Sequence, residues 1–387
     1  MKTLRPSGVL AVVALAGLSL VAGGLGEALG NCGPFTDVAA DVFCPFVLEI
    51  FYLGITTGTT ATTYDPASNV TRLQMAAFLS RTVDGVLKRG SRRAALDQFW
   101  TSTNGTILGA TTLGGTCRLL KSDGADIWVA NTGAGTVNRV RASDGKVLET
   151  STSANLAFGV LVAMGRIFVS GGTNPGSLYG IDPSQPAGAV TILASNVGIG
   201  AQGITFDGAR IWTANGNGTV SIITPGPSIP WTVTTVTIGL QLNGAVFDGN
   251  SVWVTEVASP GKLDKLDANG AVLMSVTAGT TPLHPVFDGS NIWVPGGTSN
   301  ATVVRASTGA ILSILTGNGL ENGGTVAAFD GQRVLFTAQN SDLVSIWKAA
   351  DLSPITNVSL GDIPFGACSD GVYFWVTVQG GGRLLRF

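Results

Sequence analysis

Histidine is nearly absent from this chain of 387 residues, because His284 is its only one. That scarcity excludes zinc and copper sites built from clustered histidines. Charged residues are also sparse, at 12 % of the sequence with a formal net charge of −2, so no basic surface for nucleic acid is expected. His284 stands in Pro-Leu-His-Pro without a neighbouring glutamate, and we interpret it as a loop residue rather than a catalytic base.

The first thirty residues have the pattern of an export signal. Lys2 and Arg5 precede an apolar run from Val9 to Val21, and small residues follow up to Gly30. The run is shorter than the roughly twenty apolar residues that a membrane-spanning helix needs. Residues 1–30 are therefore predicted to be a signal peptide of a secreted protein.

Glycine, by contrast, is abundant at 54 residues, and seven of these glycines mark a repeat. Each follows an apolar strand, usually as Asp-Gly, and precedes a second strand that usually contains tryptophan. They lie at positions 124, 165, 208, 249, 289, 331 and 371, at intervals of 40 to 43 residues. Four short strands per repeat of this length predict a mainly β fold, a seven-bladed β-propeller over residues 98–387.

The two ends of the repeat region predict how the ring closes. The chain stops at Phe387, directly after a third strand, with no fourth strand to follow. Asn104 to Leu108 repeats the second turn of a blade and the strand after it. We therefore expect this early segment to supply the missing outer strand of the last blade and so to remove the exposed sheet edges.

The recurring tryptophans and aspartates have structural interpretations. Tryptophan in the same register of five repeats is expected to form the core between blades rather than a ligand platform. Single aspartates about forty residues apart do not form a calcium cage, and their place before glycine is typical of a turn. The repeats resemble the broad group of YVTN, quinoprotein-like, lactonase-like and streptogramin-lyase-like propellers, which implies a fold but no chemistry.

The four cysteines are expected to behave as two different pairs. Cys32 and Cys44 lie close together near the N-terminus of an exported chain, and we predict a disulfide between them. Cys117 and Cys368 belong to the first and last repeats, but their positions relative to the turn differ by four residues. That offset is about 13 Å along a strand, too far for a disulfide, so both are expected to be buried thiols.

Residues 31–90 depart from the repeat and are predicted to form a small helical module, joined by a linker over residues 91–97. One short helix is expected at residues 44–54, with proline in its first turn. A second begins at Thr71, where Gln74 gives the spacing of a capping box. Its apolar positions at 73, 76, 79, 83 and 86 predict one buried stripe.

This module resembles the S-layer homology family. The segments that carry the resemblance are Phe35-Thr-Asp-Val38, Ile50 to Gly58 (IFYLGITTG), Tyr64-Asp-Pro66, Val70 to Gln74 and Ala76 to Leu79. The resemblance implies binding of peptidoglycan-linked, often pyruvylated, wall polysaccharide at the bacterial cell surface. It also makes Arg72, in the Thr-Arg motif, the candidate contact to the anionic sugar, with Asp37 as a second candidate. Gln74 stands where the family often has glutamate, and one copy is present.

The function expected from the sequence is therefore wall attachment combined with binding of an unidentified ligand or protein by the propeller. The alternative is a propeller enzyme, either a metal-dependent lyase or a lactonase-like hydrolase. No nucleophile elbow, phosphate-binding loop or Cys-His pair is present in the sequence. No cofactor, metal site or catalytic residue is predicted.

Overall fold

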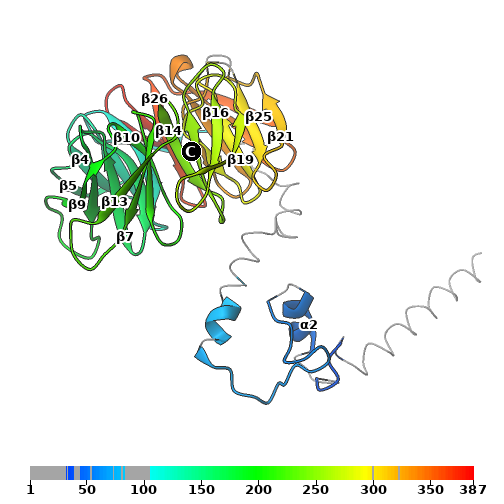
Figure 1. Ribbon diagram of the computed structural model, residues 1–387. Coiled ribbons are helices and arrows are strands. Elements are labelled where there is room, and N and C mark those ends of the chain that lie inside the picture. Colours follow the sequence, from blue (N-terminus) through cyan, green and yellow to red (C-terminus); the bar gives the residue numbers. More distant parts are fainter. Residues whose placement is uncertain are drawn as a thin grey trace, which may run out of the picture. The chain divides into compact units, whose positions relative to one another are not determined.

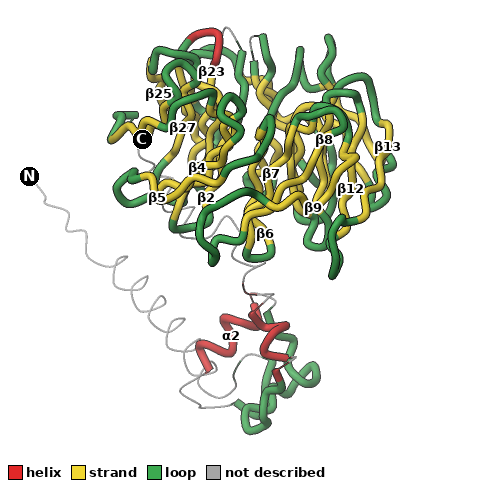
Figure 2. The backbone as a smooth tube through the Cα atoms, turned by 90° about the vertical axis from the view of Figure 1, so that its left-hand side faces the viewer, coloured by secondary structure: helices red, strands yellow, loops and turns green. Residues whose placement is uncertain are grey.

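The computed structural model describes residues 32, 34–38, 44–52, 55–72, 74–79, 82, 105–298, 300–320 and 323–387. The predicted signal peptide and the linker lie outside these residues. The chain divides into two compact units, residues 1–92 and 93–387, and each is described by itself. Helix is found mainly in the first unit and strand in the second (Figures 1 and 2).

The second unit consists of seven antiparallel sheets of four strands each, which we number as blades 1 to 7. Blade 1 contains β2 (Cys117–Ser122), β3 (Asp126–Asn131), β4 (Thr136–Arg141) and β5 (Val147–Ser151); blade 2 contains β6 (Ala157–Ala163), β7 (Arg166–Gly171), β8 (Gly176–Ile181) and β9 (Thr191–Val197). Blade 3 contains β10 (Ala201–Phe206), β11 (Ile211–Asn215), β12 (Thr219–Thr224) and β13 (Thr232–Thr237); blade 4 contains β14 (Leu242–Phe247), β15 (Val252–Glu256), β16 (Lys262–Leu266) and β17 (Val272–Thr277).

Blade 5 contains β18 (Val286–Phe287), β19 (Asn291–Pro295), β20 (Ala301–Arg305) and β21 (Ile311–Leu315). Blade 6 contains β22 (Ala327–Phe329), β23 (Arg333–Ala338), the short 3-10 helix η2 (Gln339–Ser341), β24 (Leu343–Lys348) and β25 (Pro354–Ser359). Blade 7 contains β26 (Pro364–Ser369), β27 (Phe374–Val378), β28 (Arg383–Arg386) and β1 (Gly109–Thr112). The seven blades predicted from the repeat are thus confirmed.

Blade 7 closes the ring with a strand from the other end of the sequence. β1 pairs antiparallel with β28, with Gly109 opposite Arg386 and Thr112 opposite Arg383. The strand begins just after the segment 104–108 that the sequence indicated. The Thr111 hydroxyl also donates a hydrogen bond of 2.6 Å to the carbonyl of Gly145 in blade 1, so β1 joins the last blade to the first.

The core of the propeller lies between blades. All residues of β3 are buried, as are those of β11, β15 and β27. Each of these strands is the second of its blade and is covered on both faces by the neighbouring blades. Trp128 of blade 1, for example, packs with Ile167 and Val169 of blade 2. The tryptophans of the repeat are at most 1 % exposed, which confirms their predicted place in the core.

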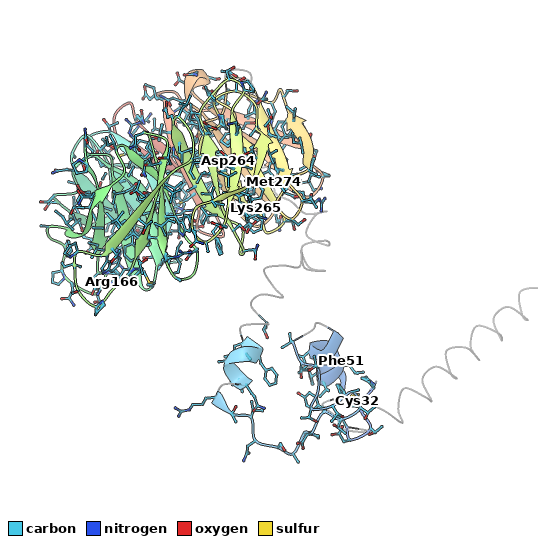
Figure 3. The ribbon with its side chains drawn as sticks, in the orientation of Figure 1. Cys32, Phe51, Arg166, Asp264, Lys265 and Met274 are labelled. Atoms are coloured by element: carbon cyan, nitrogen blue, oxygen red, sulfur yellow. A yellow bond between two sulfur atoms is a disulfide. The ribbon has the colours of Figure 1, made fainter. Side chains whose placement is uncertain are left out.

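The aspartate has a second role in five of the Asp-Gly turns, which the pattern of the repeat did not predict. In blade 4 one carboxylate oxygen of Asp248 accepts the backbone N–H groups of the turn, at 2.8 and 2.6 Å. The other oxygen accepts the indole N–H of Trp253 at 2.8 Å. Lys265 lies 3.4 Å from the same carboxylate and 4.9 Å from the centre of the indole ring (Figure 3). The Asp248 carboxylate thereby connects the backbone of the turn, the buried Trp253 indole and the Lys265 ammonium.

The same pair recurs in each of the five blades that carry tryptophan in this register of the repeat. The indole N–H donates to the turn aspartate in Trp128–Asp123, Trp212–Asp207, Trp253–Asp248, Trp293–Asp288 and Trp375–Asp370. Blade 2 carries Phe168, which has no N–H to donate, and Met164 replaces its aspartate. Asp-x4-Trp is therefore the pattern in the sequence that could have revealed this bond.

The first unit is built around α2 (Cys44–Tyr52) and a second helical stretch at residues 74–79. The capping box is confirmed: Thr71 Oγ1 accepts the N–H of Gln74 at 3.2 Å, and Gln74 Oε1 accepts the N–H of Thr71 at 2.8 Å. The predicted stripe is wrong where the structure describes it, because Ala76 is exposed and Leu79 is 60 % exposed. Ala77 and Phe78 are half-buried instead, so the helix is rotated from the expected orientation. No helix of the described residues is long and apolar enough to cross a membrane.

Candidate functional site

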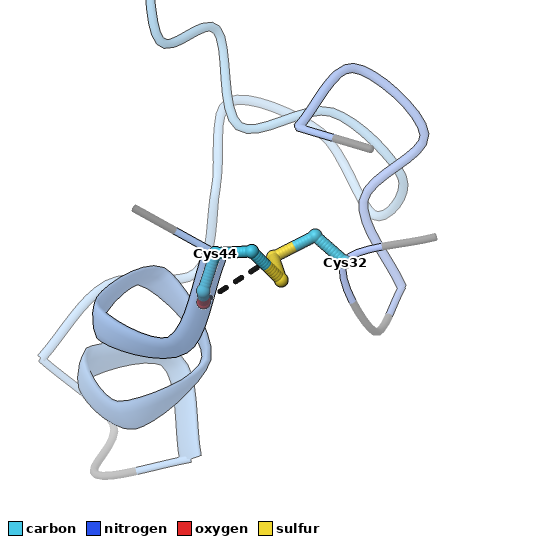
Figure 4. The surroundings of a disulfide bond; sticks show 2 residues. All are labelled: Cys32 and Cys44. Carbon is cyan, nitrogen blue, oxygen red and sulfur yellow. Dashed lines mark hydrogen bonds between the residues drawn. A yellow bond between two sulfur atoms is a disulfide. The ribbon is translucent and has the colours of Figure 1, made fainter. Parts of the chain in front are cut away.

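The N-terminal module is held together by a disulfide and a small aromatic core. Cys32 and Cys44 form the predicted disulfide, with their Cα atoms 5.5 Å apart (Figure 4). Phe35 is fully buried, with its ring centre 5.1 Å from that of Phe51 and 5.6 Å from that of Tyr64. The disulfide therefore fixes the start of α2 beside the loop that carries Phe35.

Asp37, one of the two candidate polymer-binding residues, joins the two loops of the module. Its carboxylate accepts the backbone N–H of Tyr64 at 2.9 and 3.1 Å and that of Asp65 at 2.7 Å. These bonds, first of all that from Tyr64, hold the pKa of the Asp37 carboxyl below its usual value. The phenylalanine and aspartate of the Phe-x-Asp-Val motif thus fix the Tyr-Asp-Pro segment in place.

Gly58 is the glycine of the segment Ile55 to Gly58, and its surroundings show why glycine is required at this position. Its φ of +77° lies in the left-handed region, and a Cβ at this position would lie 2.5 Å from the Phe35 ring and 2.6 Å from the Thr63 carbonyl. Only glycine fits both the backbone conformation and the space. The chain can therefore turn tightly against the aromatic core.

Arg72, the other candidate, follows the cap residue Thr71 and is exposed. Within the described residues no carboxylate lies at ion-pair distance from it. A cation in the first turn of a helix is opposed by the helix dipole, so the fold gains nothing from it there. That position suits a residue whose anionic partner is a ligand.

The propeller has a second cluster that the sequence did not reveal, where its innermost strands meet. The first strand of each blade contacts the first strands of its neighbours around the ring. In five blades this strand has an irregular register at its start, and the affected residues include Arg118, Phe158, Gln202, Asn243 and Phe365. Such bulges turn a side chain away from its regular direction.

Contacts between blades show that four side chains, those of Arg118, Phe158, His284 and Phe365, meet at the axis of the ring. Phe158 of blade 2 lies 5.8 Å, between ring centres, from His284 of blade 5 and 5.8 Å from Phe365 of blade 7. The Arg118 guanidinium of blade 1 lies 5.2 Å from the centre of the Phe158 ring and 4.9 Å from that of Phe365. Because blades 2 and 5 are not neighbours, their rings can meet only across the axis. We call Arg118, Phe158, Gln202, Asn243, His284, Val326 and Phe365 the axial ring.

His284 lies outside the named strands, before β18, as the sequence indicated, but it is buried. It is 5 % exposed, and its backbone bridges to Val326 of the next blade. Burial, and then the positive charge of Arg118, lower the pKa of its imidazole to about 3. The imidazole is accordingly neutral at physiological pH.

Buried hydroxyl groups fasten the innermost strands to one another. Thr377 Oγ1 accepts the N–H of Gly366 at 2.7 Å and donates to the carbonyl of Arg118 in the next blade at 2.8 Å. Ser170, Thr255 and Thr337 make the corresponding bonds from blades 2, 4 and 6. The backbone around the axis is thus held in place independently of the axial side chains.

The other candidate sites offer fewer unpaired groups that could bind or react with a ligand. A cavity of about 240 Å³ lies between blades 3 and 4, but Arg210 at its edge is paired with Asp207 at 2.9 Å. Cys117 and Cys368 are unpaired and buried, as predicted, and burial raises the pKa of their thiols to about 11 and about 12. Among the described residues no three His, Cys, Asp or Glu side chains gather where they could hold a metal ion.

Comparison with known proteins identifies the first unit and the fold of the second. A family model of the S-layer homology domain matches residues 34–76. The crystal structure of the WD40 β-propeller domain of Doa1 is similar, with a TM-score of 0.59 and 14 % identity over 73 % of this chain and 95 % of that one. At such identity the likeness concerns the fold alone. The comparison with curated proteins found no match. The chain therefore carries an S-layer homology domain at residues 34–76, followed by a seven-bladed β-propeller.

Proposed function

We propose that this protein is exported and held on the bacterial cell surface, where its propeller binds a ligand or a partner protein. The S-layer homology domain suggests association with the cell surface or wall, and domains of this family bind wall polymers. The signal-like residues 1–30 support export. The observation that carries the proposal is the match of residues 34–76 to that family.

We assign the polymer contact to Arg72. Its guanidinium is exposed and has no carboxylate partner among the described residues, and the reciprocal Thr71–Gln74 cap fixes the backbone on either side of it. A planar guanidinium matches the carboxylate of a pyruvylated sugar with two parallel hydrogen bonds. Asp37 belongs to the same proposed surface, and it acts there by holding the Tyr64–Asp65 backbone in position.

The test is sedimentation of the full chain with purified cell-wall sacculi, before and after removal of their attached polysaccharide. We expect binding to intact sacculi and its loss after removal. Arg72→Ala should weaken binding roughly tenfold or more, because a charge-assisted hydrogen bond contributes about 1.5–3 kcal/mol. Arg72→Lys should recover only part of it, since an ammonium lacks the planar fork.

The matched control is Arg166→Ala, which removes the same charge from the rim of the propeller (Figure 3). Arg166 is exposed and its closest carboxylate oxygen, on Asp182, is 3.8 Å away. Its variant should bind sacculi like the parent. Equal binding by the Arg72→Ala variant and the parent would remove Arg72 from the site, and no binding by the parent would remove the wall-attachment proposal.

A further inference from the structure

Arg118, in the axial ring, is a half-buried cation that has no ion-pair partner among the described residues. Its Nε atom is buried and has no hydrogen-bond partner. Within the described residues the structure also gives the rest of the guanidinium no acceptor, and no carboxylate lies within 4 Å of it. Its neighbours are the aromatic rings of Phe158 and Phe365. Burial lowers the pKa of the guanidinium, so the fold itself disfavours the charge that it encloses.

Two further polar groups of the axial ring also lack partners. His284 is 5 % exposed, and its ring nitrogens have no hydrogen-bond partner among the described residues. Asn243 donates its amide N–H to Gln202 Oε1 at 2.9 Å, but its Oδ1 atom is buried without a partner. An unpaired buried polar group costs roughly 1–3 kcal/mol, and an unpaired charge costs more. Two such atoms in one ring, Arg118 Nε and Asn243 Oδ1, are unfavourable for a purely structural plug.

We propose that the axial ring is a binding site for a small molecule that carries a carboxylate. The guanidinium offers a planar fork that a carboxylate fills with two parallel hydrogen bonds. A single guanidinium matches a monoanion better than a phosphate dianion. The neutral His284 imidazole has one donor and one acceptor to orient a polar group beside the carboxylate, and the faces of Phe158 and Phe365 receive a flat or apolar body.

This inference names the ligand class for the propeller of the proposed function, but it does not depend on wall attachment. The full chain is titrated calorimetrically with benzoate and with acetate. Benzyl alcohol, which has a similar body without the charge, serves as the neutral probe. A tripeptide with a free or an amidated C-terminus distinguishes a free small acid from a chain end. We expect saturable binding of at least one carboxylate and none of its neutral counterpart.

Arg118→Met keeps the apolar volume of the side chain and removes the charge. We expect it to weaken carboxylate binding at least tenfold and to raise the melting temperature of the ligand-free protein, because a half-buried charge with an unpaired Nε is replaced by an apolar group. Arg166→Met, at the exposed rim, should change neither quantity. The rise in melting temperature also shows that the Arg118→Met protein is folded.

The outcomes separate this proposal from the alternatives. Failure of every carboxylate to bind the parent, or equal binding by parent and Arg118→Met, would overturn it. A fall in the melting temperature of Arg118→Met, without carboxylate binding by the parent, would make the axial ring a structural plug. Sacculus binding should be unchanged in Arg118→Met, so the wall-attachment proposal and this one fail independently.

Discussion

The two units of this protein solve the problem of stability in different ways. The N-terminal module has a core of few side chains around Phe35 and adds a disulfide, Cys32–Cys44, and a carboxylate that joins its loops. The propeller leaves its two cysteines unpaired and relies on core between all its blades and on one closing strand. A short chain cannot bury enough apolar surface alone, whereas a ring of repeats can. Reduction and acid should therefore act on the N-terminal module, whereas loss of the closing strand should act on the propeller.

The largest effect should come from breaking the closure. Proline at both Ala110 and Thr111 would remove two backbone donors from β1 and distort its pairing with Leu385 and Leu384. Proline cannot donate to the strand ladder, and the change at Thr111 also removes the hydroxyl bond to the Gly145 carbonyl, so we expect the melting temperature of the propeller to fall. Tryptophan fluorescence measures this unit selectively, because residues 31–90 contain no tryptophan.

The matched control places two prolines at Thr234 and Thr235 in β13, an outer strand joined by a turn to its own blade. If β1 is a true closing strand, its variant loses more stability than the control, since it also frees an edge of blade 7. Equal losses would show that closure adds nothing beyond ordinary strand pairing.

Reduction should affect only the module. The disulfide spans a sequence separation of 12 residues, and a loop of that size stabilises a fold by about 3 kcal/mol. Cys32→Ala with Cys44→Ala, or treatment with a thiol, should therefore increase hydrogen exchange over residues 44–79 and leave the tryptophan transition unchanged. Reduction that lowers the propeller transition instead would contradict the free state of Cys117 and Cys368.

A smaller loss is expected from the aspartate–tryptophan pair in the propeller. Asp248→Asn removes the charge that faces Lys265 and weakens the bond from the Trp253 indole. We expect a loss of about 2 kcal/mol by denaturant titration, because bonds to charged groups contribute about 1.5–3 kcal/mol. Asp144→Asn, in an exposed second turn, should cost much less. Equal losses would mean that the aspartate acts only within the turn.

The smallest predicted effect is the loss of local stability in the N-terminal module at low pH. The folded pKa of Asp37 lies below its unfolded value, which is about 3.9 for a free side chain. Its contribution is therefore complete above that value and is lost as the pH falls through the folded pKa. Amide protection of Tyr64 and Asp65, corrected for intrinsic exchange, should decline in that range in the parent. In Asp37→Asn it should be low at every pH, and persistent protection there would contradict this role of Asp37.

The interval of the Asp-Gly turns, the capping-box spacing and the Phe-x-Asp-Val motif were sufficient for predicting the propeller, the helix start and the module. These features depend on neighbours in sequence, so a linear pattern records them. The stripe at Ala76 and Leu79 was misplaced because a helical period indicates which residues share a face, not which face is covered.

The repeat interval and the cysteine positions were thus enough to predict the seven blades, the disulfide and the two buried thiols, whereas the closing strand lies at residues 109–112, just beyond the predicted segment 104–108. Only the tertiary structure decided the axial ring, since Arg118, Phe158, His284 and Phe365 come from four blades and are up to 247 residues apart in the sequence. The prolines beside His284 predicted a loop, but nothing in the sequence indicated that the rings of Phe158 and Phe365 would enclose it. Contacts across a closed ring leave no periodic signal in the chain, because they arise when the innermost strands of all seven blades converge on one axis.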